Sequence, residues 1–317
     1  MDGTAGALAR ERSRGGHRSG AHLDEANARG RLRAWLELGR VSNLPTIGTQ
    51  TAAAIAIAIA AGAPVDVLDV VGLGGGFAAS YTAGMFLNDA FDRHFDARHR
   101  PDRPIPALRL TAAEVFGAGF ALLAFGAGLT VLVASRHGHA LAGAAGALAL
   151  SFAIVLYDVW HKGNPLAPLV MGACRGLVYL AAVLGLTGTL DPLAIVAALA
   201  MVAYVAGLTD VARSKGAPPV RGAVALGVAP IVLAAASLVV GRSVLGALAA
   251  AALATVAAAA LRHAKDGHGE RAVVLLLAGL SLVDATLLAS TGHPLLGVAA
   301  VVAMPLTRKL QAFVRGT

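Results

Sequence analysis

The stretch FAASYTAGMFLNDAFDRHFDARHRPDRPIP, residues 77–106, passes directly from an apolar run into a cluster of charged residues. From residue 88 onward it holds four Asp, four Arg and two His in nineteen residues. The whole chain of 317 residues is 57% hydrophobic and only 14% charged, well below the roughly 25% that is typical of a soluble domain. The stretch therefore indicates a membrane helix that ends in a chemically specialised loop.

Apolar segments recur from residue 44 to residue 306, and several reach the ~20 residues that a helix needs to cross a bilayer. Backbone groups in lipid must be hydrogen-bonded internally, so segments of this length are helices. We predict an all-α, polytopic integral membrane protein with about nine transmembrane helices, followed by a shorter apolar segment at 294–306 that is a partial or tilted tenth. The nine predicted spans are 44–61, 67–87, 112–133, 139–157, 165–187, 191–209, 220–240, 243–261 and 271–290.

Lysine and arginine are distributed unevenly between the two sets of breaks. With the N-terminus on the cytoplasmic side, the cytoplasmic breaks carry twelve of these residues and the opposite breaks carry two. Since cytoplasmic loops are enriched in Lys and Arg, we expect the N-terminus and the acidic cluster on the cytoplasmic face of a bacterial cytoplasmic membrane. Residues 1–30 are expected to be a disordered basic tail, and residues 31–317 a single transmembrane domain. The net charge of +8 then reflects orientation, and no nucleic-acid partner is expected.

Asn88, Asp89, Asp92 and Asp96 fall on one arc of about 100° when each residue advances the helix by about 100°. Carboxylates stacked one turn apart repel one another, so their retention on one face suggests that a cation completes the site. Oxygen ligands suit Mg²⁺, which proteins usually hold with one or two carboxylates together with substrate phosphates.

The loop that follows supplies Arg98, Arg100 and Arg103 among three prolines. Proline ends the helix and stiffens the loop, and the planar guanidinium group matches phosphate oxygens. A metal-binding face on one side and arginines on the other predict a diphosphate site. A solvated loop that merely follows the charge rule explains the arginines equally well, but it does not explain the spacing of the acids.

The pattern N-D-x-x-D-x-x-x-D at the end of a second transmembrane helix, followed by R-P-x-R-P-I-P, resembles the first signature of the UbiA superfamily of intramembrane prenyltransferases. The resemblance covers about residues 40–310. It implies that a Mg²⁺-bound isoprenyl diphosphate is ionised and that the allylic cation alkylates an acceptor. It also implies that Asn88, Asp89, Asp92 and Asp96 serve the metal and the diphosphate.

The family's second acidic motif, of D-x-x-x-D type, corresponds here to YVAGLTDVARSKGAP, residues 204–218. Asp210 matches the first acid of this motif and is expected to be a catalytic metal ligand, but Ser214 stands in place of the second acid. One hypothesis is that Arg213 and Lys215 contact the diphosphate and partly replace a second metal ion. The alternative is that the catalytic function has been lost.

The stretch YDVWHKGNPLAPLVMGACRG, residues 157–176, is similar to the family's Tyr-Pro…Lys-Arg segment, with Asp158 in place of the usual Pro. We expect Lys162 and Arg175 to bind diphosphate. Arg175 lies roughly 15 Å into an apolar span, where an ionisable group is expensive and suggests function. A structural pairing of Arg175 with a nearby Asp is the alternative. Asp284 interrupts the ninth span, and for it a structural hydrogen bond is favoured over a role toward the acceptor.

The resemblance implies a Mg²⁺-dependent enzyme that moves an isoprenyl group from a prenyl diphosphate to a small acceptor, aromatic or other. The alternative belongs to another class. The acidic stretch, residues 157–176 and the reduced second motif also resemble the EboC branch of the superfamily, which is associated with carrying or exporting secondary metabolites. Such a carrier needs no prenyl diphosphate and should tolerate the loss of Asp92.

Overall fold

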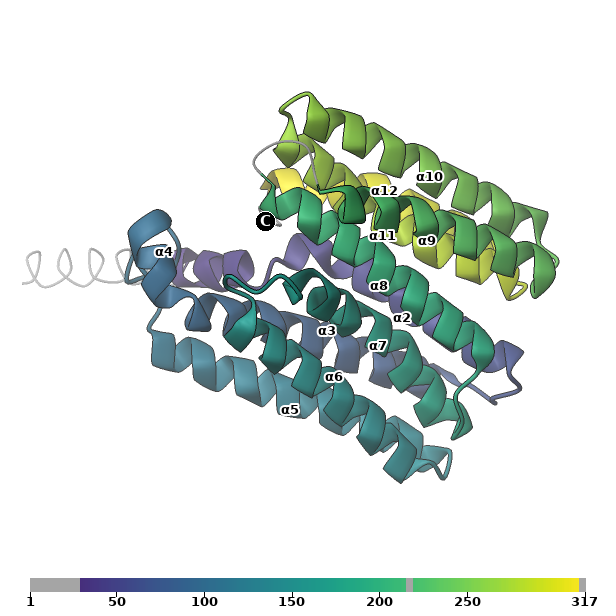
Figure 1. Ribbon diagram of the computed structural model, residues 1–317. Helices are drawn as coiled ribbons and strands as arrows, with labels where there is room; N and C mark the ends of the chain where they lie inside the picture. The colour runs from purple at the N-terminus through teal and green to yellow at the C-terminus, as the bar shows by residue number, and fades with distance from the viewer. Residues whose placement is uncertain (1–28, 215–218, 314–317) are drawn as a thin grey trace, which may run out of the picture.

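The computed structural model of the chain describes residues 29–214 and 219–313, and within these ranges the chain forms helices and short connections without any strand (Figure 1). The predicted all-α class is confirmed. Most of the expected N-terminal tail and the predicted site residue Lys215 lie outside the described residues.

Residues 29–38 are helical and precede the first labelled element. The elements that follow are η1 (Val41–Asn43), α2 (Leu44–Ala60), α3 (Val67–Phe91), α4 (Arg93–His99), α5 (Ala112–Arg136), α6 (Ala140–Trp160), α7 (Ala167–Thr187), α8 (Pro192–Arg213), α9 (Val220–Val239), α10 (Val244–Lys265), α11 (Gly269–Ser290) and α12 (Pro294–Phe313).

Eight of these helices, α3 and α5 to α11, are long and apolar enough to cross a membrane. Helix α2 has 17 residues, which is the lower end of the spanning range, and it packs among the eight, so the count agrees with the nine predicted helices. Helix α12 is longer than its apolar segment suggested, because it continues to Phe313 through a polar stretch.

The long helices lie side by side, and most of them pack against their neighbours in the sequence (Figure 1). Helices α2 and α11 break this order, since α2 contacts α3, α7, α11 and α12, while α11 contacts α2, α8, α9, α10 and α12. The apolar window of α11 is 78% buried, against 28% for α5 and α10. The centre of the bundle is therefore built around α2 and α11, with α5 and α10 at its outside.

Small residues set the closest helix contacts, as expected where membrane helices pack without a hydrophobic driving force between them. At the α3–α5 crossing, a Cβ at Gly126 would collide with Ser80 Oγ and would lie 2.5 Å from the carbonyl oxygen of Gly76. This close contact fixes the position of α3, which carries the acidic cluster at its C-terminal end.

The opposite end of α3 is fastened to α5 by ion pairs. Arg136 lies 2.6 Å from both Asp66 and Asp69, and His137 lies 3.0 Å from Asp69. Asp66 and Asp69 also form the capping box of α3. The hydrogen bond from Arg136, followed by that from the Asp69 backbone, lowers the pKa of Asp66 to about 2. Both of these carboxylates thus serve the helix junction.

Two glycines on α5 test whether the α3–α5 contact is essential for stability. Gly126→Ala should lower the thermal unfolding midpoint in detergent, because overpacking a close contact costs about 1–3 kcal/mol. A methyl group added at Gly128 would meet no described atom within 4 Å, so Gly128→Ala is the matched control and should leave the midpoint unchanged or raise it. Equal midpoints for the two variants would show that the contact is not tight.

Candidate functional site

The acidic cluster lies where α3 continues into α4. The backbone N–H of Asp92 donates to Asn88 O and that of Asp96 donates to Asp92 O, each at 2.9 Å, so the helical register runs through the junction. Asn88, Asp92 and Asp96 consequently stand one turn apart, as predicted. All of them and Asp89 are buried, at 9% exposure or less.

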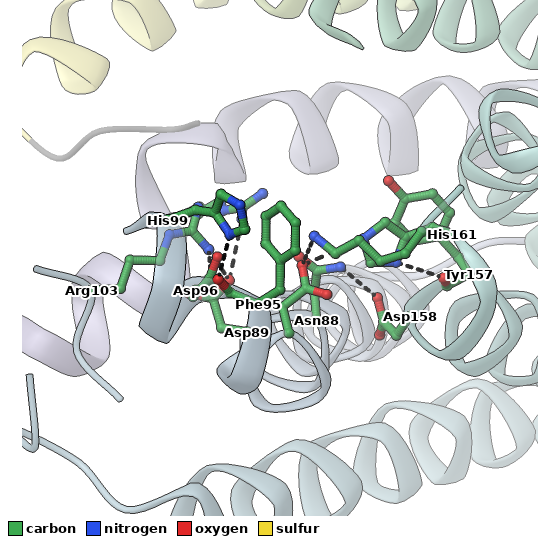
Figure 2. Close-up of polar contacts among 12 residues, drawn as sticks. Asn88, Asp89, Phe95, Asp96, His99, Arg103, Tyr157, Asp158 and His161 are labelled. Atoms are coloured by element: carbon green, nitrogen blue, oxygen red, sulfur yellow. Dashed lines mark hydrogen bonds and ion pairs between the residues drawn. The ribbon is translucent and has the colours of Figure 1, made fainter. Parts of the chain in front are cut away.

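The loop after α4 returns one arginine to this cluster. Arg103 Nη1 lies 2.8 Å from Asp89 Oδ1 and 3.2 Å from Asp96 Oδ2 (Figure 2). Arg40 Nη2 lies 3.4 Å from the same Asp89 oxygen, and Arg40 has a left-handed backbone with φ of 43°. Non-glycine residues rarely adopt this conformation unless their surroundings enforce it. The side chain of Arg100 is exposed and makes no ion pair within the described residues.

Asp92 faces a different pair of side chains, from the end of α6. Lys162 Nζ lies 2.8 Å from Asp92 Oδ2, and His161 Nε2 lies 3.4 Å from the same oxygen. Lys162 also sits 4.0 Å above the centre of the Phe95 ring. Burial opposes ionisation of Asp92, but the hydrogen bonds from His161 and Lys162 outweigh it, so the pKa of Asp92 lies below its usual value. Asp92 is therefore held as a carboxylate.

Asp158 brings a fifth buried polar side chain to the site, and with it a fourth carboxyl group. Asn88 Nδ2 donates to Asp158 Oδ1 at 3.2 Å (Figure 2). The other oxygen, Oδ2, has no hydrogen-bond partner among the described residues, although Asp158 is only 4% exposed. An unpaired buried oxygen of this kind costs free energy, which suggests that a ligand supplies its partner.

The acidic side chains do not by themselves form a complete metal site in the described residues. Within the described residues, no three His, Cys, Asp or Glu side chains lie together in a way that could hold a metal ion. Cations of the chain occupy the space between the carboxylates instead. The donor set still suits Mg²⁺, which commonly takes one or two protein carboxylates and completes its shell with phosphate oxygens and water.

Asp210 has a partner that the sequence did not reveal. Arg221, at the start of α9, lies with Nε 3.0 Å from Asp210 Oδ2 and with Nη2 3.1 Å from Oδ1. The predicted contact residue Arg213 donates to the carbonyl oxygen of Asn164, at 3.1 Å. Both oxygens of Asp210 are thus engaged by one guanidinium group.

Arg175 lies apart from the acidic cluster. Its Nη1 donates to Gln50 Oε1 at 3.1 Å and its Nη2 to Thr46 Oγ1 at 3.0 Å. Asp284 accepts from Thr49 at 2.6 Å and from Tyr179. The favoured structural role of Asp284 agrees with these bonds, which tie α11 to α2 and α7.

Four residues that contact the predicted site acids were missed or undervalued in the sequence analysis: Arg40, Asp158, His161 and Arg221. Their signals were weak: Arg40 lies just before a predicted span, Arg221 is the second residue of another, His161 adjoins Lys162, and Asp158 replaces a usual proline. Only the contact of Arg40 with α3, together with the packing of α3 against α6 and of α8 against α9, reveals which acids they face.

Comparison of the sequence and the fold with known proteins identifies the family of this chain. The sequence profile of the UbiA prenyltransferase family matches residues 50–316. A digeranylgeranylglyceryl phosphate synthase of Methanosarcina mazei is 36% identical over 126 residues, which cover 38% of this chain and 42% of that protein. The match therefore spans less than half of the curated relative.

Solved structures agree in fold. A UbiA homologue from Aeropyrum pernix K1 has a TM-score of 0.63 at 17% identity, over 81% of this chain and 96% of that one. A UbiA homologue from Archaeoglobus fulgidus, bound to DMAPP and Mg²⁺, has a TM-score of 0.60 at 13% identity, over 84% and 99%. Since the family profile covers most of the sequence and the fold matches along nearly the whole of these homologues, the chain belongs to the UbiA prenyltransferase family.

Proposed function

We propose that the protein is a Mg²⁺-dependent intramembrane prenyltransferase that moves an isoprenyl group from a prenyl diphosphate to a small acceptor. The observation that carries this proposal is the set of buried acids at one end of an apolar helix bundle, each beside a cation or amide. Family membership, the synthase name of the Methanosarcina relative and the DMAPP and Mg²⁺ bound by the Archaeoglobus homologue support it.

Asn88, Asp89, Asp92 and Asp96 would hold the metal with the diphosphate. When bound, Mg²⁺ neutralises charge on the leaving diphosphate. Arg103 and Lys162, which pair with these acids, would turn to the phosphate oxygens. Cations aimed at charge that develops during the reaction lower its barrier.

In the reaction, the bond between the isoprenyl C1 and the diphosphate oxygen breaks, and diphosphate leaves with the electron pair. The acceptor then donates an electron pair to C1 and loses a proton to solvent or to the released diphosphate. Long apolar helices around the site would keep water away from the allylic cation.

The remaining predicted residues have less direct support. Asp210 is held by Arg221, so we leave it outside the Mg²⁺ site proposed here. Arg213 lies close enough to the α6–α7 connection to approach a bound diphosphate after a side-chain rotation. Residues 31–317 would form the single membrane domain, with the acidic end and the N-terminus facing the cytoplasm of a bacterial cell.

A carrier without catalytic activity is the second candidate. The observation in its favour is the second motif, where Ser214 replaces an acid and Arg221 covers Asp210. The buried, cation-lined first cluster favours the enzyme, because a carrier for neutral metabolites has no use for it.

Asp92→Asn should abolish Mg²⁺-dependent release of diphosphate from allylic diphosphates, with a loss of at least about a hundredfold. The assay uses purified protein in lipid with geranyl, farnesyl and geranylgeranyl diphosphates. Asp102→Asn changes an exposed acid of the same segment and should keep full activity. If the wild type releases no diphosphate, and if the wild type and Asp92→Asn bind a transported metabolite equally well, the results would support the carrier.

Lys162→Ala should have opposite effects on metal binding and on turnover. Without substrate, Lys162 competes with Mg²⁺ for Asp92, so its removal should tighten the binding of Mg²⁺ alone by about tenfold, as removal of a charge at 2.8 Å implies. Diphosphate release should fall at the same time. Calorimetric titration and the release assay measure the two effects. Weaker binding of Mg²⁺ alone would contradict the competition.

The second motif should accept a metal only after two changes. Ser214→Asp combined with Arg221→Gln restores an acid one turn after Asp210 and removes the guanidinium group that engages it. With a non-hydrolysable prenyl diphosphate analogue bound, Mn²⁺ titration followed by electron paramagnetic resonance should give one ion for the wild type and two for the double variant. Two ions in the wild type would place Asp210 in a metal site.

A further inference from the structure

Asp158, near the end of α6, differs from the other buried acids of the site in its partners. It is 4% exposed, and Asn88 Nδ2 donates to its Oδ1 at 3.2 Å (Figure 2). Its Oδ2 has no hydrogen-bond partner among the described residues, and no Lys, Arg or His nitrogen of those residues lies within 4.0 Å of the carboxyl group. Protonation would not remove the problem, because a buried hydroxyl donor also needs a partner.

The carboxylates of the acidic cluster each face a cation. Arg103 lies 2.8 Å from Asp89 and 3.2 Å from Asp96. Lys162 lies 2.8 Å from Asp92. The carboxyl group of α6, by contrast, has a neutral amide as its neighbour. A buried carboxylate without a positive partner is costly, so it is at α6 that the site lacks positive charge.

The α6 carboxyl group also borders open space. Asp158 lines a cavity of about 70 Å³ between α2, α3, α6 and α7. Since one water occupies roughly 30 Å³ in the liquid, the cavity has room for an ion with one or two of its waters. Arg175 lines the same cavity, but its guanidinium hydrogen bonds go to Gln50 and Thr46. The partner of Asp158 can therefore come from outside the chain.

Asn88 connects Asp158 to the acidic face of α3. The backbone N–H of Asp92 donates to Asn88 O at 2.9 Å, so these two residues stand one turn apart, where side chains are neighbours. Lys162, four residues after Asp158, contacts Asp92 and so holds the end of α6 against α3 at the same place. Asp92 and Asp158 thus both neighbour Asn88, one from α3 and the other from α6.

We propose that Asp158 is a further ligand of the Mg²⁺ ion and binds it together with Asp92 and Asn88. This inference rests on the proposed function, which assigns the ion ligands from the acidic cluster alone. Mg²⁺ usually takes one or two carboxylates and completes its shell with phosphate oxygens and water, a demand that Asp92 and Asp158 meet. The ion would supply the positive partner that Asp158 lacks, and it would link α6 to α3.

The second motif cannot supply this carboxylate. Arg221 engages both oxygens of Asp210, and Ser214, one turn later, carries a hydroxyl group. A ligand from α6 gives the ion its second carboxylate without breaking the pair between Arg221 and Asp210.

The first test measures metal binding directly. Mn²⁺ is titrated into protein in lipid nanodiscs with a non-hydrolysable geranylgeranyl diphosphate analogue present, and electron paramagnetic resonance follows the unbound ion. Asp158→Asn keeps an oxygen that can accept from Asn88 Nδ2 but removes the charge. Asp102→Asn removes an exposed acid of the loop after α4 and is the control. The thermal unfolding midpoint of each variant shows that it is folded.

We expect Asp158→Asn to weaken Mn²⁺ binding by about tenfold or more, since the loss of an outer-shell partner of a metal already costs about that much. The control should bind Mn²⁺ as tightly as the wild type does. Equal affinities of Asp158→Asn and the wild type would overturn the inference. Unchanged metal binding together with slower diphosphate release would overturn it as well, and would assign Asp158 to a later step.

A change of metal preference tests direct contact with the ion. Asp158→Cys is made in a Cys174→Ala background, because Cys174 lines the same cavity. A thiolate prefers soft ions, so Asp158→Cys should bind Mg²⁺ about tenfold or more weakly than the background protein and should bind Cd²⁺ more tightly. A residue that only positions Asn88 would leave the preference unchanged, which would contradict direct ligation.

The two proposals fail in different ways. A wild type that binds neither Mn²⁺ nor the diphosphate analogue, and releases no diphosphate, contradicts the proposed function and with it this inference. A wild type that binds both, and whose metal affinity and metal preference do not depend on Asp158, contradicts the inference alone.

Discussion

The structure depends on one constraint: carboxylates buried at the end of an apolar helix must each have a partner. A charge taken out of water without compensation is far too costly for a marginally stable protein. Here Arg103 and Arg40 compensate Asp89, and Lys162 and His161 compensate Asp92. These partners come from three separate segments, so the same contacts that make the acids tolerable also draw the loops together over the end of α3.

This arrangement has a functional consequence. Internal cations pair with Asp89, Asp92 and Asp96, and under the proposed function the same cations would bind phosphate oxygens. In the proposed reaction the site would exchange one set of ion pairs for another, so that the cations that leave the acids find new partners in the same step. Three carboxylates packed together without such partners would repel one another, and no group of three His, Cys, Asp or Glu side chains that could hold a metal ion occurs among the described residues.

The sequence predicted the features that depend on local rules, namely the positions of the helices and the residues that share a helix face. Hydropathy located the helices to within a few residues, and the spacing of Asn88, Asp92 and Asp96 indicated a shared face, because helical geometry alone fixes both. It did not predict contacts between distant segments. Arg221 engages Asp210 from the start of the next helix, α9, and Arg40, whose backbone is left-handed, contacts Asp89 from 49 residues away in the sequence. No periodic pattern encodes either contact.

Arg175 and Arg103 lie at different depths in the bundle and have different neighbours, which charge alone does not reveal. From composition, every arginine near an acidic motif is equally a diphosphate ligand. The structure distinguishes them by their neighbours: Arg103 lies among carboxylates, whereas Arg175 lies among the neutral side chains of Gln50, Thr46 and Tyr81. In the proposed reaction, a guanidinium group paired with acids would be released when metal and phosphate take over those acids. Arg175, whose partners are neutral, would have no such ion pairs to exchange.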